Sequence, residues 1–165
     1  MGGRNQIDYT AMIDQESMAA MERMRQEDPN IRDINPLCPG RFAIRFEDGS
    51  AMLVDIKGEI IKSPLEKYDV ISRIEYIGTL EGKPHFAFEG RDWANRKKSE
   101  TGIFDSDGHR KLFRDPRAAG IDGVEYLKWE FERLEKLSKD PMNPRRNDPV
   151  LIDVDSPHPS RGVKL

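Results

Sequence analysis

The segment FDSDGHR, at residues 104–110, holds the side chains best suited to bind a metal ion. Asp105 and Asp107 offer carboxylate oxygens at alternate positions before Gly108, as at the start of a calcium-binding loop. Such a loop also needs a terminal glutamate that binds through both oxygens. No glutamate follows at the required distance, and His109 stands at the third ligand position. Because Asp-Gly between apolar segments is typical of a hairpin turn, the sequence predicts a turn here and no metal site.

The other residues that commonly carry out catalysis are scattered along the chain. His85 falls in an expected strand, His109 at the edge of a turn and His158 in the C-terminal tail. Cys38 stands between two prolines, and as the only cysteine it excludes an internal disulfide and a cysteine-based zinc site. No phosphate-binding loop, dinucleotide glycine fingerprint or nucleophile elbow is present. We therefore predict no catalytic residues and no cofactor, and a dispersed site around His85 and His109 is the enzymatic alternative.

A basic segment, GRDWANRKKSE at residues 90–100, is the first candidate surface for a partner. It combines one aromatic residue, Trp93, with four cations: Arg91, Arg96, Lys97 and Lys98. Cations beside an exposed aromatic ring can bind phosphate and stack a base, or they can anchor a protein interface. A solvated turn with Trp93 folded over the sheet is the structural alternative.

A second candidate surface lies near the C-terminus, in the segment PVLIDVDSP at residues 149–157. Its apolar residues are Val150, Leu151, Ile152 and Val154, with aspartates around them. A short segment of this type is well suited to join an exposed sheet edge as an added strand. The sequence leaves open whether that edge belongs to another protein or to this chain's own sheet.

Two helices are expected on either side of the central part of the chain. The first spans Thr10 to Asp28, begins with Asp8 or Thr10 as its cap and ends at Asp28-Pro29. Its four methionines, at positions 12, 18, 21 and 24, either pack against the same chain or form an adaptable docking surface.

The second helix has the clearest pattern in the sequence. Asp122 and Glu125 have the spacing of a capping box, and the helix is bounded by Pro141. An apolar stripe follows with intervals of three and four residues, formed by Val124, Leu127, Phe131 and Leu134. Trp129 lies off this stripe, and we expect it to cover part of the core.

Between these helices, residues 41–113 consist of short apolar segments separated by turns. Four turns contain a glycine at the second position, at residues 48–49, 57–58, 81–82 and 107–108. Such turns between alternating segments are the strongest short-range indication of hairpins, because glycine accepts a positive φ. We predict a curled antiparallel β-meander of six to eight strands.

Two of these hairpins have similar sequences. LVDIKGEI at 53–60 and IFDSDGHR at 103–110 place Asp55 opposite Asp105 and Gly58 opposite Gly108. The longer stretch AMLVDIKGEIIKSPLEKYDVI, and more faintly TGIFDSDGHRKLF, resembles the WG β-hairpin repeats of bacterial proteins, although the Trp-Gly pair is absent. The resemblance implies a β-rich scaffold for interactions, with no known catalytic residues.

Composition narrows the classes of function. The chain has 165 residues and a net charge of −3, from 27 basic and 30 acidic residues, which argues against bulk electrostatic capture of nucleic acid. No apolar stretch approaches the roughly 18 to 20 residues that cross a bilayer, and no signal peptide is recognisable at the start. We therefore expect no membrane contact and a cytoplasmic location.

Together these patterns predict an α+β protein in three parts. Residues 1–40 form the N-terminal helix and a proline-containing linker, residues 41–138 the β-meander with the C-terminal helix, and residues 139–165 a disordered tail. We predict a non-catalytic protein-binding module: an adaptor, inhibitor or assembly factor. The alternative is an accessory protein that binds nucleic acid through residues 90–100, and homo-oligomerisation is left open.

Overall fold

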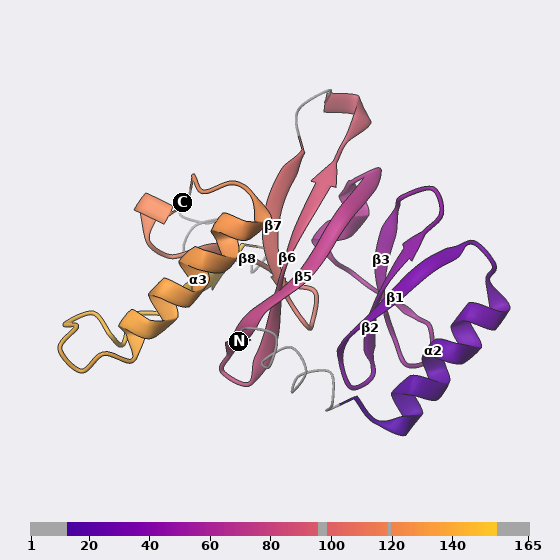
Figure 1. Ribbon diagram of the computed structural model, residues 1–165, viewed down its shortest axis with the longest axis horizontal. Coiled ribbons are helices and arrows are strands. Elements are labelled where there is room, and N and C mark those ends of the chain that lie inside the picture. The colour runs from indigo at the N-terminus through magenta and orange to yellow at the C-terminus, as the bar shows by residue number, and fades with distance from the viewer. Residues whose placement is uncertain (1–12, 96–98, 119, 155–165) are drawn as a thin grey trace, which may run out of the picture.

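Two antiparallel sheets packed face to face form the centre of the molecule, and one helix covers the outer face of each (Figure 1). The computed structural model describes residues 13–95, 99–118 and 120–154. Three apolar clusters lie between the successive layers: one between the first helix and the first sheet, one between the sheets, and one between the second sheet and the second helix. The predicted α+β class with antiparallel sheets is confirmed.

Sheet A is a four-stranded meander in which spatial order follows the chain. Its strands are β1 (Ile31–Cys38), β2 (Arg41–Phe46), β3 (Ala51–Asp55) and β4 (Ile60–Ile61). The predicted linker therefore contains a strand. This strand accommodates Pro36 because β1 lies at the edge of the sheet, where a residue without an N–H group is tolerated. The register between β1 and β2 shifts after Pro36.

Sheet B is a five-stranded antiparallel meander. Its strands are β5 (Val70–Leu80), β6 (Lys83–Arg91), β7 (Glu100–Asp105), β8 (Arg110–Phe113) and β9 (Leu151–Asp153). Short 3₁₀ helices follow β6 and β8, as η2 (Trp93–Asn95) and η3 (Pro116–Ala118).

The described residues form nine strands in two sheets, so the prediction of one curled meander of six to eight strands is wrong in this respect. The break falls at a further 3₁₀ helix, η1 (Pro64–Lys67), between β4 and β5. Ser63 caps η1 by accepting a hydrogen bond from the Leu65 N–H, and Leu65 is fully buried between the sheets. Because Pro64 lacks an N–H group and Leu65 is anchored in the core, the chain leaves sheet A at this point.

Helix α2 (Gln15–Glu27) covers sheet A. It begins at Asp14, which accepts a hydrogen bond from the Ser17 N–H at 2.9 Å, whereas the predicted caps Asp8 and Thr10 lie outside the described residues. Met21 and Met24 pack against sheet A, Met18 is exposed, and Met12 lies outside the described residues.

Helix α3 (Val124–Ser138) covers sheet B through the predicted apolar stripe, whose central residue Phe131 is fully buried. The capping box is not formed: Gly123 is the N-cap, and no side chain caps the helix. Asp122 instead accepts a hydrogen bond from the Thr101 hydroxyl at 2.7 Å, and that contact ties the start of the helix to β7.

The C-terminal segment departs from the predicted disordered tail. Residues 139–154 are described and end in β9, which pairs with β8. Of the two alternatives for the apolar segment, the structure contains the one in which it joins the chain's own sheet. Residues 155–165 lie outside the described part of the chain.

Candidate functional site

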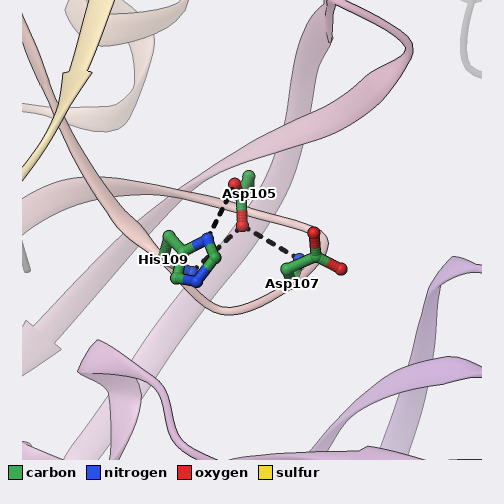
Figure 2. Close-up of side chains that lie close together, drawn as sticks. All are labelled: Asp105, Asp107 and His109. Carbon is green, nitrogen blue, oxygen red and sulfur yellow. Dashed lines mark hydrogen bonds and ion pairs between the residues drawn. The ribbon is translucent and has the colours of Figure 1, made fainter. Parts of the chain in front are cut away.

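The Asp105 turn is a hairpin turn, as predicted. One carboxylate oxygen of Asp105 accepts hydrogen bonds from the N–H groups of Asp107 and His109, at 2.9 and 3.0 Å (Figure 2). Asp55 accepts two equivalent bonds in the hairpin between β3 and β4, each at 2.9 Å. The two similar sequence segments therefore share one turn geometry, in which an aspartate side chain satisfies the N–H groups of the turn.

Carboxylate and imidazole atoms of Asp105, Asp107 and His109 come within 4.8 Å of one another, a spacing that a cation could use (Figure 2). The chain's own cations are already in place there. Asp107 contacts Lys83 at 2.7 Å and also binds Arg41. Because these cations already neutralise Asp107, a divalent ion would have to displace them.

The charges around this turn join the two sheets. Arg41 belongs to β2 in sheet A, whereas Asp107 lies in the β7–β8 turn of sheet B. The hydrogen bond from Lys83 holds the pKa of Asp107 below its ordinary value. Lys111 lies 3.6 Å from the buried carboxylate of Asp105. This cluster has the composition of a structural ion network, with every described carboxylate in it facing a cation.

Two of the remaining candidates for catalysis, His85 and Cys38, are unfavourably placed for it. His85 is only 3% exposed, and its Nδ1–H donates to the Lys83 carbonyl oxygen at 2.8 Å. Burial raises the pKa of the Cys38 thiol, the opposite of what a nucleophilic cysteine requires. His158 lies outside the described residues.

The predicted basic surface is described only in part. Trp93 is 57% exposed in η2, and the Arg91 guanidinium lies 6.0 Å from the centre of its ring. The 3₁₀ helix η2 projects beyond the end of β6 (Figure 1). Arg96, Lys97 and Lys98 lie outside the described residues. Since its own arginine stands beside the indole, this tryptophan presents less open ring surface to a base than an isolated one would.

The second predicted surface lies elsewhere, at the edge of sheet B formed by β9. Leu151 is buried in the core below α3, and Val150 is partly buried there. Ile152 and Val154 are exposed, and Ile152 pairs with the exposed Leu112 of β8. The structure therefore divides this segment between core and surface and does not unite it with the basic segment.

Sequence reasoning missed the most exposed aromatic pair among the described residues. Tyr126 and Trp129 stand on α3 with 67% and 61% of their surface exposed, so the expectation that Trp129 covers the core is wrong. At 100° per residue, the exposed Leu137 falls on the same side of the helix as Tyr126. We call Tyr126, Trp129 and Leu137 the α3 outer face. The signal in the sequence was the position of Trp129 off the apolar stripe. Leu137 was expected to extend that stripe, three residues after Leu134, but it is 39% exposed.

Several charged residues on or near α3 are paired within the chain. Lys128 contacts Glu75 at 3.2 Å, and Arg133 contacts Glu130 at 2.6 Å. Arg73 of β5 contacts Glu125 at 2.9 Å. The α3 outer face therefore offers large apolar side chains near three ion pairs, and the exposed Glu132 and Lys136 lie on the same helix.

Comparisons with known protein families, with curated proteins and with solved structures find no match to this chain. Neither helix among the described residues has the length and apolar content needed to span a membrane.

Proposed function

We propose that this protein is a non-catalytic binding module that recognises another protein through the α3 outer face. The observation that carries the proposal is the exposure of Tyr126 and Trp129, one turn apart on a helix whose opposite side is packed on sheet B. Trp and Tyr are enriched among the residues that dominate interface energies, because a large rigid ring buries much area for little conformational entropy.

The pattern of charge favours a protein over a nucleic acid as the partner. A nucleic-acid surface needs cations that are available to phosphate groups. Beside the α3 outer face, Lys128 and Arg133 are instead paired with carboxylates. An apolar patch on another protein can bind this face without breaking those ion pairs. The basic segment at residues 90–100 keeps its predicted partner role as a separate proposal.

Site-specific photocrosslinking tests this proposal. A photoreactive phenylalanine analogue is placed at position 126 or 129 of the full chain in its native cells. The matched control carries it at Met18, which is similarly exposed on the other helix. We expect one protein to be crosslinked from positions 126 and 129 and not from 18.

Two results would contradict the proposal. Equal crosslinking from all three positions would indicate nonspecific contact, and crosslinking to a second copy of this chain would make the face an oligomer interface. As a further check, Trp129→Ala should reduce recovery of the crosslinked protein at least about tenfold in affinity capture, which corresponds to roughly 1.4 kcal/mol.

A further inference from the structure

A small pocket opens at the C-terminal end of α3, next to the α3 outer face. Its volume is about 140 Å³, and it lies between the last turns of α3, the segment after β8 and the segment that leads to β9. Leu134, Leu137 and Val150 line it with apolar surface. Because an apolar cavity of about 150 Å³ is large enough for benzene, this pocket admits one ring or one short side chain.

Guanidinium groups outnumber carboxylates around this pocket. Arg114, Arg117 and Arg145 line it, together with Asp115 and Asp148. One oxygen of Asp148 serves two of the arginines, at 3.3 Å from Arg114 and 3.1 Å from Arg145. Two guanidinium groups that share one carboxylate oxygen leave one positive charge uncompensated.

At the end of the helix, the Leu137 carbonyl group is already hydrogen-bonded. Helix C-termini carry partial negative charge on their carbonyl groups. Here the Leu137 carbonyl oxygen accepts hydrogen bonds from the Asn143 side chain at 2.8 Å and from the Asp140 N–H at 3.2 Å. With this carbonyl group occupied, the arginines set the polarity of the pocket.

We infer that this pocket binds a carboxylate, supplied by an acidic side chain of the protein partner. The inference rests on the proposed function, since Leu137 belongs to both the α3 outer face and the pocket wall. A partner lying along α3 therefore reaches the pocket without leaving that face. Arg114 and Arg145 provide planar donors for the carboxylate oxygens, and the leucines receive the carbon atoms of the side chain.

Titration with benzoate, followed by NMR on the ¹⁵N-labelled full chain, tests the pocket without any partner. We expect benzoate to shift the amide signals of Ser138, Asn143 and Val150, whereas neutral benzamide and cationic benzylamine leave them in place. Arg145→Ala should weaken benzoate binding at least about fivefold. Arg146→Ala is the matched control. It removes the same charge from the neighbouring residue, whose side chain does not line the pocket.

Equal shifts with benzamide, or benzoate binding that Arg145→Ala leaves unchanged, would overturn the carboxylate site. Capture of the crosslinked protein by the Arg145→Ala variant then tests the source of the carboxylate. We expect this variant to capture at least about fivefold less of the crosslinked protein. Unchanged capture would overturn the inference that the partner supplies the carboxylate. Failure of the proposed function is seen separately, as loss of position-specific crosslinking at 126 and 129 while benzoate still binds.

Discussion

Phe131 of α3 lies directly against the backbone of Gly78 in β5. A Cβ atom added to Gly78 would overlap Cε2 of the Phe131 ring and stand 3.1 Å from Cδ2. The β5–β6 register shifts between Tyr76 and Gly78, so the ring packs at an irregularity in the sheet. This contact fixes the height of α3 above sheet B, and with it the position of the α3 outer face.

We therefore expect Gly78→Ala to lower the free energy of unfolding by about 1–3 kcal/mol, the usual cost of overpacking a core. Phe131 is fully buried and has no room to move aside. Urea denaturation measures the change. Gly120→Ala is the control, because a Cβ at Gly120 meets nothing within 4 Å. Equal stability of the two variants would show that the ring contact is not rigid.

The ion pairs of Asp107 predict a dependence of stability on acid pH. The bond from Lys83 lowers the pKa of Asp107 from its ordinary 3.8 in the folded protein. A carboxylate with a lowered folded pKa stabilises the protein above its unfolded pKa, and that contribution is lost as the pH falls through the folded value. Asp107→Asn should thus cost on the order of 1 kcal/mol at pH 7 and progressively less below about pH 4.

Denaturation of both forms between pH 7 and pH 3 measures this difference. The control is Glu66→Gln, which removes an exposed carboxylate in η1. If the cost of Asp107→Asn were the same at pH 3 as at pH 7, the loss would come from packing and not from the charge of Asp107.

His85 predicts a second dependence on pH, in a different window. Burial lowers its pKa from the ordinary 6.5, so the folded protein keeps the imidazole neutral where the unfolded chain takes up a proton. Stability from this group is therefore complete above about pH 7 and declines as the pH falls below 6.5. His85→Gln should flatten the decline between pH 7 and pH 5, whatever its effect at pH 7.

NMR of the histidine rings provides the direct measurement. The signals of His85 should titrate at a lower pH than those of an ordinary histidine. His109→Gln is the companion variant. It should keep the contribution of His85 to the decline of stability between pH 7 and pH 5. A His85 ring that titrates with a midpoint at 6.5 or above would contradict the prediction.

Local patterns in the sequence were sufficient for the elements held by local chemistry. The apolar stripe around Phe131 predicts α3, and the Asp-x-x-Gly segments at Asp55 and Asp105 predict two similar turns, in which the structure contains equivalent hydrogen bonds. The arrangement of strands depends on long-range pairing. From the sequence alone, Pro36 indicates the end of a strand, and only the pairing shows that its strand lies at a sheet edge. No local rule predicts that the chain passes from one sheet to the other at Pro64.

The candidate site was harder to predict than the fold. The sequence marks Trp129 as lying off the apolar stripe, but only the packed structure shows that nothing within the described residues covers it. The pocket is also out of reach of sequence reasoning, because Arg114 and Arg145 are 31 positions apart and meet only when β9 has joined sheet B.

The last prediction concerns β9, which sets the position of one wall of the pocket. Leu151 is buried under α3, whereas its neighbour Ile152 is 42% exposed on the other face of the sheet. Leu151→Ala should lower the free energy of unfolding by about 2–4 kcal/mol, because it removes buried methyl groups and leaves a cavity. Ile152→Ala should cost about 1 kcal/mol or less, within the range of strand propensity.

Hydrogen exchange of two amides separates loss of β9 pairing from a purely local cavity. The N–H groups of Arg114 and Val154 donate to carbonyl oxygens on the opposing strand segment, at 3.0 and 2.9 Å. In Leu151→Ala both amides should exchange faster than in Ile152→Ala, because the strand loses its anchor in the core. If both variants were equally stable and equally protected, β9 would be held by its backbone bonds alone, and the pocket would not depend on Leu151.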